Sequence, residues 1–394
     1  MNAAASPHAP ASLTEVIAHE IHRAGGWLPF DRFMHLALYA PGLGYYARDA
    51  RQFGPLARDG SDFVTAPELS PLFGRTLAAQ VAQALQQSGS REIWEFGAGS
   101  GALAGQVLQE LARLGQPAVR YTIVDVSAAL RARQQARLAA HGGVVRWAGA
   151  LPPALSGVVI GNEVLDAMPV KLLARAGGAW HERGIALSET FTVTTNTEPG
   201  MAAIEKGLHH GPRPFIWADR PTALRPPLEI PDEHDVVTEI HPQQRAFIAT
   251  LAERLRAGTG GAAFFIDYGF PQAEYYHPQR DMGTLVCHRA HRVDDDPLTD
   301  VGEKDITAHV DFTGIALTAQ DAGLAVLGYT SQARFLLNCG IARHMQAADL
   351  PARATAMKLL AEHEMGELFK VIGLATGPGW PALGFAQGDR CHRL

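Results

Sequence analysis

The feature that most constrains the fold is a glycine-rich turn in the stretch EIWEFGAGSGALAGQVLQEL, residues 92–111. The apolar run EIWEF before the turn predicts a buried strand. Leu103, Val107 and Leu111 after it are spaced four positions apart, which places them on one face of a helix. A strand, a tight glycine turn and a helix in this order are typical of the ligand-binding turn of open α/β sheets. We therefore expect an α/β fold with a ligand held at this turn.

Short apolar runs alternate with helical patterns through the rest of the chain. They indicate a doubly wound, mostly parallel sheet. The segment between the strands ending near 162 and beginning near 262 is much longer than an ordinary crossover, so we interpret it as an inserted subdomain. The predicted strands are 92–96, 119–126, 144–148, 157–162, 262–269, 324–330 and 371–377, with helices near 242–256 and 312–322.

The residues ahead of the glycine turn have helical patterns. Ser12 and Glu15 form a capping box for a helix at about 13–24. Ser70 and Pro71 are typical of the N-cap and first residue of a further helix. The expected organisation is a disordered start at 1–11, a helical region at 12–90, a main α/β domain formed by 91–170 and 257–394, and the inserted subdomain at 171–256.

The composition limits the partners and the compartment. A formal net charge of -6 leaves no basic stripe for nucleic acid or for an anionic membrane surface. No apolar run approaches the ~18 residues that a membrane span needs. The three cysteines are far apart with no CxxC pair, so no disulfide framework is predicted. The start MNAAASPHAPASL lacks a signal core and early arginines, so we expect a cytoplasmic protein rather than a secreted or mitochondrial matrix protein.

The neighbours of the glycine turn narrow the choice of ligand. A P-loop requires Gly-Lys-Ser or Gly-Lys-Thr, which this turn lacks, so a nucleoside triphosphate is poorly supported. Gly97, Gly99 and Ala102 fit the dinucleotide pattern G-x-G-x-x-G/A, with Asp125 at the end of the next strand. Glu95 distinguishes the alternatives, because a carboxylate there would repel a pyrophosphate and attract an ammonium group. At about 4 Å and an effective dielectric constant of 20, the interaction of two unit charges is worth roughly 4 kcal/mol.

This acidic setting favours S-adenosylmethionine, which carries a cationic amine and a cationic sulfonium but no phosphate. Gly97, Gly99 and Gly101 would let the backbone approach its methionyl part, and Asp125 could accept hydrogen bonds from both ribose hydroxyls. A plain tight turn would explain the glycines but not Glu95 and Asp125. A dinucleotide and a plain turn are the alternatives to S-adenosylmethionine.

A second group of polar residues follows an apolar strand in IGNEVLDAMPV, residues 160–170. Asn162, Glu163 and Asp166 stand beyond the carboxyl end of that strand, where open parallel sheets bind their ligands. The alternative is that Asn162 or Glu163 caps a helix and Asp166 is solvated. Two carboxylates near a sulfonium suit a guanidinium acceptor, because arginine stays protonated and must be held and polarised before a nitrogen can attack. One carboxylate could also accept the proton that is lost.

The acidic segment DPLTDVGEKDITAHVDF, residues 296–312, contributes further candidates. His309 and Asp311 point the same way if the segment is extended, and we include both as catalytic candidates. Asp311 also stands where an N-cap for the following helix is expected. No metal site is predicted, because the aspartates at 294–296 lack the order of a calcium loop and Glu367 replaces the second histidine of an H-E-x-x-H motif.

Five blocks occur in order along the chain: SDFVTAPELSPLFG, EFGAGSGALAGQVL, GNEVLDAMPV, FIDYG and DITAHVDF. Together they resemble the MidA family of S-adenosylmethionine-dependent methyltransferases, which includes a mitochondrial arginine methyltransferase that assists assembly of respiratory complex I. The resemblance spans about 13 to 385. It implies a class I, Rossmann-like methyltransferase fold with a family-specific insertion, S-adenosylmethionine as methyl donor, and symmetric dimethylation of a protein arginine in the mitochondrial member.

The resemblance also assigns residues. The block SDFVTAPE is similar to the family's N-terminal element that closes over the cofactor, which nominates Thr65 and Glu68. Many relatives carry an acid where this chain has AGALP, so the adenine would be held mainly by backbone near Ala150 and Leu151. Asn162 is expected on the cofactor side of the transferred methyl group.

The leading hypothesis is therefore a protein methyltransferase that acts on an arginine of a partner protein, of the respiratory complex I subunit type. Two alternatives stand beside it. One is an assembly factor that binds S-adenosylmethionine without catalytic turnover, and the other is a nicotinamide-dependent oxidoreductase.

Overall fold

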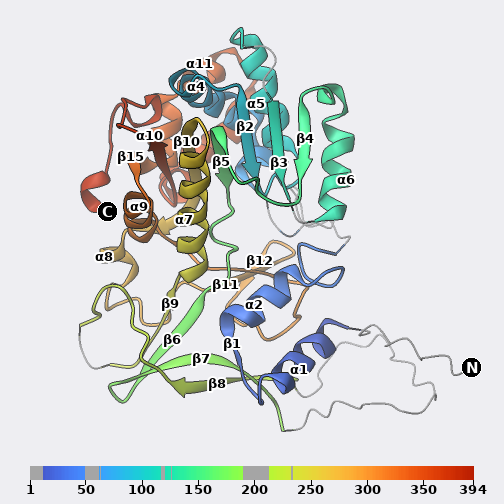
Figure 1. Ribbon diagram of the computed structural model, residues 1–394, viewed down its shortest axis with the longest axis vertical. Coiled ribbons are helices and arrows are strands. Elements are labelled where there is room, and N and C mark those ends of the chain that lie inside the picture. Colours follow the sequence, from blue (N-terminus) through green and yellow to red (C-terminus); the bar gives the residue numbers. More distant parts are fainter. Residues whose placement is uncertain are drawn as a thin grey trace, which may run out of the picture.

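The computed structural model describes residues 12–48, 62, 64–116, 120–125, 127–189, 213–231 and 234–394. The prediction of a disordered start at 1–11 lies outside these residues. The chain forms a main body around one large sheet and a second body around a smaller sheet (Figure 1). Within the described ranges, no helix combines the length and the apolar character that crossing a membrane would require.

The main body is built on an eight-stranded sheet in the order β15-β16-β10-β5-β2-β3-β4, with β14 pairing β10 outside this path. The five strands from β10 to β4 are parallel, and β16 is antiparallel to both of its neighbours. All seven strands predicted from the sequence are present, within three residues at each end. Their bounds are β2 Glu92–Phe96, β3 Arg120–Val124, β4 Val145–Ala148, β5 Ser156–Asn162, β10 Gly260–Phe270, β14 Val310–Asp311, β15 Leu324–Ser331 and β16 Phe369–Thr376.

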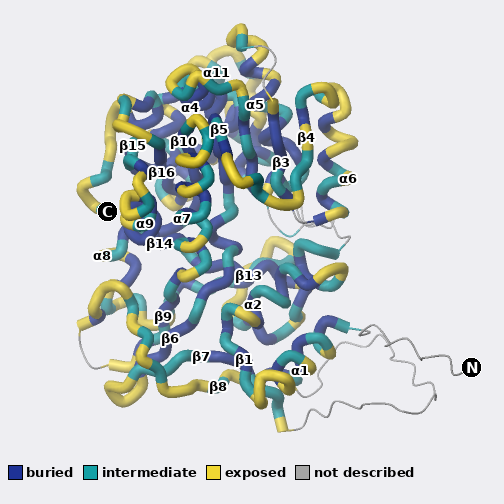
Figure 2. The backbone as a smooth tube through the Cα atoms, viewed as in Figure 1, coloured by how far each residue is buried: buried dark blue, intermediate teal, exposed yellow. Residues whose placement is uncertain are grey.

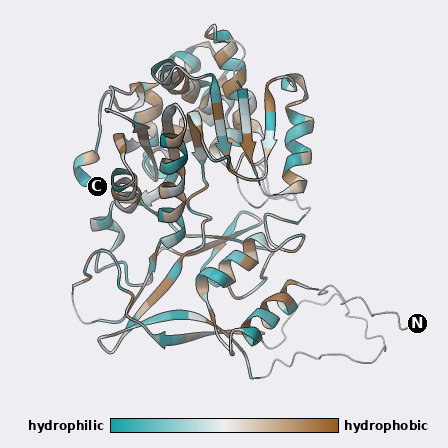
Figure 3. Ribbon diagram, in the orientation of Figure 1, coloured by the Kyte–Doolittle hydropathy of each residue, from teal (hydrophilic) through white to brown (hydrophobic). Residues whose placement is uncertain are grey.

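Alternating strand residues supply two cores, one on each face of this sheet. In β5, Ile160 packs into one core with helices α4 and α5, whereas Val159 packs into the other with α7 and α9. Figure 2 shows the strands buried between these helices. At the sheet edge, α6 is largely hydrophilic (Figure 3). The helices are α3 Ala66–Leu69, α4 Pro71–Ser88, α5 Ala102–Arg113, α6 Ala128–Arg137, α7 Pro242–Ala257, α8 Gln272–Tyr275, α9 Phe312–Asp321, α10 Gln332–Asn338, α11 Ile341–Ala347 and α12 Leu350–Leu360.

The second body joins the start of the chain to the insertion. Its larger sheet has the order β1-β7-β6-β9 with β8 on β7, and a three-stranded sheet, β12-β11-β13, lies beside it. Apolar faces of α1 and α2 pack with Leu172, Ile185 and Ile306 in a separate core. The bounds are α1 Leu13–Arg23, β1 Leu28–Pro29, α2 Phe30–Tyr39, β6 Lys171–Ala176, β7 Ala179–Leu187, β8 Phe215–Pro221, β9 Val236–Ile240, β11 Val286–Arg289, β12 Arg292–Asp294 and β13 Asp305–Thr307.

This packing divides the chain differently from the boundaries expected from its sequence. The helices predicted within 12–90 separate, because α1 and α2 pack in the second body while α4 packs on the main sheet. Helix α7 falls within the expected insertion at 171–256, yet Ile248 and Leu251 belong to the core of the main body. An amphipathic pattern shows which face of a helix is buried but not which element covers it, so such boundaries are not evident from local sequence.

Candidate active site

A cavity of about 660 Å³ lies where the carboxyl ends of β2, β3 and β5 meet the second body. Figure 1 shows the arrowheads of β2 and β3 pointing toward that body. The volume is in the range of small-molecule sites, and the position is where open α/β sheets bind ligands. Among the described lining residues are seven carboxyl side chains and a single lysine, so the cavity favours a cationic ligand. These carboxyl groups belong to Glu68, Glu95, Asp125, Glu163, Asp166, Asp305 and Glu364.

The glycine turn forms the floor of this cavity. Gly97, Gly99 and Gly101 have φ angles of 60°, 52° and 84°, in the left-handed region that favours glycine. A Cβ atom on Gly97 would lie 3.0 Å from Cγ2 of Val164, which also lines the cavity. The sequence therefore folds into a turn whose backbone a ligand can approach closely.

Glu95 and Asp125 stand at the ends of neighbouring strands beside the turn. Glu95 is 2% exposed and accepts a 2.8 Å hydrogen bond from the hydroxyl of Tyr121. Burial raises the pKa of Glu95 to about 8, and repulsion from Asp125 adds to this effect. Asp125 accepts hydrogen bonds from the backbone N–H of Ser127 at 2.9 Å and from Nε2 of Gln134 at 2.7 Å.

Gln134 is a residue that sequence reasoning missed. Its Nε2 also donates to the carbonyl of Gly99 at 3.0 Å, and its Oε1 accepts from Nε1 of Trp147 at 2.9 Å. Gln134 thus ties the glycine turn to Asp125. A glutamine within a polar helix such as α6 carries no local signal of this role.

Asn162 and Glu163 lie directly at the end of β5. Glu163 has a φ angle of 54°, an uncommon conformation for a residue with a side chain, and its N–H donates to the carbonyl of Ile266 at 2.9 Å. Nδ2 of Asn162 donates to Oε1 of Glu163 at 2.9 Å, while Oδ1 of Asn162 has no partner in the described part of the chain. Burial, followed by repulsion from Asp166, raises the pKa of Glu163 to about 8.

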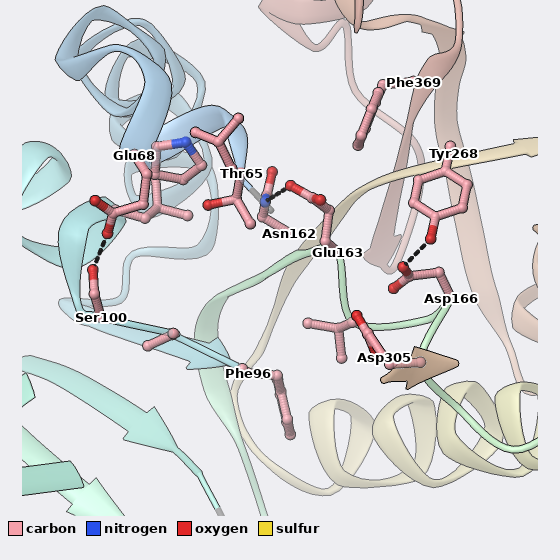
Figure 4. A pocket seen from close by; sticks show the side chains of 18 of the residues that line it. Thr65, Glu68, Phe96, Ser100, Asn162, Glu163, Asp166, Tyr268, Asp305 and Phe369 are labelled. Atoms are coloured by element: carbon pink, nitrogen blue, oxygen red, sulfur yellow. Dashed lines mark hydrogen bonds between the residues drawn. The ribbon is translucent and has the colours of Figure 1, made fainter. Parts of the chain in front are cut away.

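Asp166 faces the same cavity from the loop after β5. The hydroxyl of Tyr268 donates to Oδ2 of Asp166 at 2.5 Å, as Figure 4 shows, while Oδ1 has no partner within the described ranges. Burial raises the pKa of Asp166 to about 6. The carboxyl group of Asp267 accepts hydrogen bonds from three successive backbone N–H groups of this loop, those of Val164, Leu165 and Asp166. Asp267 therefore fixes the loop and does not line the cavity.

The segment that contains Thr65 and Glu68 covers the glycine turn. Both side chains line the cavity, and Glu68 accepts a hydrogen bond from the hydroxyl of Ser100 (Figure 4). Arg137 pairs with Glu68 at 2.7 Å. The carbonyl of Pro67 accepts a 2.7 Å hydrogen bond from Gln106. These contacts attach α3 to the glycine turn, to α5 and to α6.

Of the two catalytic candidates in this segment, His309 lines the cavity and Asp311 does not. The extended segment is only two residues long before α9 begins, so Asp311 becomes the N-cap and accepts from the N–H of Gly314 at 2.8 Å. His309 stacks on Phe270 with ring centroids 5.1 Å apart. Burial, aided by Arg280, lowers the pKa of His309 to about 4, so its imidazole is neutral at physiological pH.

Ala150 and Leu151 also lie outside the described lining of the cavity. Ala150 is exposed, and Leu151 packs against the core shared with α7. The expectation that their backbone holds the adenine is therefore not supported by their position.

Further lining residues come from elements that sequence reasoning did not connect to the site. Tyr39 and Tyr46 come from the N-terminal part of the chain, Asp305 from β13, and Phe369 from β16. The hydroxyl of Tyr46 lies 2.9 Å from both carboxyl oxygens of Asp305. DITAH begins with this aspartate, but nothing local distinguishes it from the solvated acids before it.

The site suits S-adenosylmethionine by its own features. The turn at Gly97 leaves a space that a Cβ atom would narrow. The Oδ1 atom of Asn162 lacks a hydrogen-bond partner among the described residues. Glu95 and Asp125 offer carboxyl groups, and no lysine in the described lining beside them would bind a phosphate. No cluster of three His, Cys, Asp or Glu side chains within the described ranges could hold a metal ion. The arrangement can bind a cationic donor beside a second cation.

Comparisons with known proteins agree with this geometry. Residues 76–330 match a family described as S-adenosyl-L-methionine-dependent methyltransferases. A Burkholderia thailandensis protein crystallised with S-adenosyl-homocysteine is 47% identical, with a TM-score of 0.87 over 97% of this chain and 96% of that chain. A second crystal structure of a protein from that organism, in its native form, is 45% identical, with a TM-score of 0.83 over 97% and 96% of the two chains.

Curated relatives extend the likeness to eukaryotes. The protein arginine methyltransferase NDUFAF7 homolog, mitochondrial, of Caenorhabditis elegans is 26% identical over 87% of this chain and 79% of the relative. The protein arginine methyltransferase NDUFAF7, mitochondrial, of Danio rerio is 26% identical over 89% and 84%. The fold is that of a Rossmann-like methyltransferase, and the cofactor is S-adenosylmethionine. The chain therefore belongs to this family of S-adenosyl-L-methionine-dependent methyltransferases, as its resemblance to the MidA family predicts.

Proposed function

We propose that this enzyme methylates an arginine side chain of a partner protein. The observation that carries the proposal is the placement of two carboxyl groups beyond β5, those of the partly buried Glu163 and the buried Asp166, in the same cavity as the glycine turn. The names of the Caenorhabditis elegans and Danio rerio relatives support arginine as the acceptor. Their identity of about a quarter is the reason that the acceptor needs a direct test.

The cofactor roles follow from the positions described above. When bound, S-adenosylmethionine supplies an electrophilic methyl group on a positively charged sulfur. Gly97, Gly99 and Gly101 would hold its methionyl part through their backbone, and the carboxyl groups of Glu95 and Asp125 would bind its ammonium group and its ribose hydroxyls, respectively. The remaining cofactor contacts are assigned to Thr65, Glu68 and Asn162.

The carboxyl groups of Glu163 and Asp166 orient the acceptor. Each accepts hydrogen bonds from the guanidinium, which concentrates positive charge on the bound nitrogens and leaves another nitrogen directed at the methyl carbon. On transfer, that nitrogen would form a bond to the methyl carbon as the carbon–sulfur bond breaks, with the electron pair left on sulfur. The proton lost from the nitrogen passes to one of the two carboxylates and then to water. Neutral His309 is proposed to accept a hydrogen bond from the acceptor in the same cavity.

The test is to incubate the protein with methyl-labelled S-adenosylmethionine and an extract of source-organism cells that lack the gene. Hydrolysis of the labelled protein should release methylated arginine. Measurable cofactor binding with no labelled protein would instead favour an assembly factor without turnover. Mass spectrometry of cells with and without the gene then identifies the acceptor, and the family resemblance makes respiratory complex I subunits the first to inspect. We propose a bacterial cytoplasmic setting, because identity to the Burkholderia proteins exceeds identity to the mitochondrial ones.

A further inference from the structure

The second body contributes a carboxyl group to the cavity. Asp305 begins β13, is 3% exposed, and lines the same cavity as Glu163 and Asp166. Among the described residues, Tyr46 is the only one whose side chain donates a hydrogen bond to Asp305, and both carboxyl oxygens share that one hydroxyl. Among the described residues, the charges that act most on Asp305 are other carboxyl groups, including Asp62, and no cation is among them. A buried carboxyl group without a cation needs a proton or a positively charged ligand to balance its charge.

Asp305 lies close to the two carboxyl groups of the main body. Burial, followed by repulsion from Asp166, raises the pKa of Asp305 well above its usual range, and Asp305 in turn adds to the raised pKa of Glu163. All three residues line the same cavity, and Figure 4 shows Asp305 below Glu163 and Asp166, with the Glu163 carboxyl turned toward Asn162. Asp166 supplies an independent sign of a ligand there, because this buried residue lines the cavity and its Oδ1 atom has no partner within the described ranges.

Four aromatic rings line the same cavity. Tyr39 and Tyr46 stack with centroids 5.7 Å apart and planes inclined by 20°. Tyr268 and Phe369 form a second pair, with centroids 5.4 Å apart, and both lie on the same side of Glu163 as Asp166 (Figure 4). Flat aromatic faces suit a planar, delocalised cation that can also receive carboxylates along its edges. A guanidinium has this shape, whereas an ammonium group is a compact point charge.

We propose that Asp305, held by Tyr46, is a specificity-determining residue that binds the edge of the acceptor guanidinium opposite Glu163 and Asp166. This inference rests on the proposed function. The acceptor side chain is then bound by both bodies of the protein, since Asp305 and Tyr46 belong to the second body and the other two acids to the main body. The arrangement selects arginine over lysine because carboxyl groups on separate sides require a cation with donors on separate edges.

The test compares Asp305→Asn with a matched control, Asp300→Asn. Asp300 is in the same segment, but its side chain is 54% exposed and pairs with Arg289 outside the cavity lining. Its φ of 49° is one that asparagine tolerates. Both variants are titrated with S-adenosyl-homocysteine by calorimetry and assayed with labelled S-adenosylmethionine and the cell extract described above. We expect both to bind S-adenosyl-homocysteine within two-fold of wild type, while labelling of arginine falls about 100-fold in Asp305→Asn alone.

Tyr46→Phe provides a second readout. Removing the hydroxyl leaves the Asp305 carboxyl in place but without its donor, so we expect a smaller loss of labelling than in Asp305→Asn and unchanged S-adenosyl-homocysteine affinity. Wild-type labelling by Asp305→Asn would overturn this inference and leave the proposed function intact. Labelling by the wild-type enzyme of a residue other than arginine, or of nothing, would overturn the proposed function, and the inference about Asp305 would fall with it.

Discussion

The hydroxyl of Tyr121 donates a 2.8 Å hydrogen bond to Oε2 of Glu95 from the adjacent strand. This is the only side-chain bond recorded for the Glu95 carboxyl in the described part of the chain, and it does not offset the cost of burial, since the pKa of Glu95 is raised to about 8. The ligand-free protein therefore keeps a proton on Glu95 at neutral pH. A cation that binds beside Glu95 favours the charged carboxylate and displaces that proton.

Proton release on cofactor binding follows from this pairing. At pH 7 we expect S-adenosylmethionine binding to release about one proton more from wild type than from Glu95→Gln, because glutamine has no proton to lose. Calorimetry in two buffers of different ionisation enthalpy measures this number. The affinity of the variant should also fall by roughly 1.5 to 3 kcal/mol. Equal proton release by the two proteins would show that Glu95 is already ionised or faces no cation.

The stability of the ligand-free protein should fall as pH rises. Glu95 and Glu163 have pKa values of about 8 and Asp166 of about 6, all raised by burial. Such groups bind more protons folded than unfolded, so their contribution is complete below the unfolded pKa of about 4.5 and is lost as pH rises through the folded values. We expect Tm to decrease from pH 5.5 to 8.5, and the Tm increase caused by S-adenosylmethionine to be larger at pH 8 than at pH 6. Thermal scans check both trends, which a rising Tm would contradict.

Local patterns were sufficient to predict the elements that carry the cofactor side of the site. The strand at 92–96, the caps at Ser12 and Ser70, and the left-handed glycine turn all depend on interactions within a few residues of sequence. The placement of Asn162 and Glu163 at the cavity follows from a rule about the ends of parallel strands. These features could be predicted because the residues that cause them are close together in the sequence.

The acceptor side could not be predicted in the same way. Tyr46 and Asp305 meet across 259 positions of sequence, and the pairing requires the N-terminal helices to pack in the second body. Asp311 had a plausible extended position next to His309, but the helix that begins at Phe312 uses it as a cap. The contact between Tyr46 and Asp305 leaves no local signal in the sequence, whereas the cap at Asp311 was one of two roles that the local pattern allowed.

Replacing Glu163 by glutamine should separate cofactor binding from transfer. Glutamine retains the shape of the side chain, so we expect the affinity for S-adenosylmethionine to stay within a few-fold of wild type. Methyl transfer should be abolished, because the acceptor arginine loses the enzyme carboxylate that binds it. The control is Glu253→Gln on the exposed face of α7, which should leave both properties unchanged. Calorimetry and the labelling assay give the two readouts. Normal turnover by Glu163→Gln would remove Glu163 from the acceptor site.

The backbone at Glu163 is strained. Its φ of 54° is unfavourable for any residue with a Cβ, by about 1 kcal/mol relative to glycine. Glu163→Gly and Glu163→Ala both remove the carboxyl group and should both be inactive. We expect the glycine variant to be more stable than the alanine variant by about that amount in urea unfolding. Equal stabilities would mean that the loop after β5 relaxes to another conformation when the side chain is lost.

Alanine substitutions at two glycines can separate the effect of backbone strain from the effect of blocking the ligand. Gly97 and Gly177 have similar φ angles of 60° and 57°, but a Cβ on Gly97 would lie 3.0 Å from Val164, whereas one on Gly177 would have no atom within 4 Å. Alanine at either position should lower the free energy of unfolding by about 1 kcal/mol, because both adopt the left-handed conformation. Only Gly97→Ala should weaken S-adenosylmethionine binding, by at least about ten-fold, since its methyl group moves Val164 into the cavity or occupies the space over the turn. Calorimetry on both folded variants tests this, and an equal loss of affinity in Gly177→Ala would show that general destabilisation, rather than the shape of the turn, is the cause.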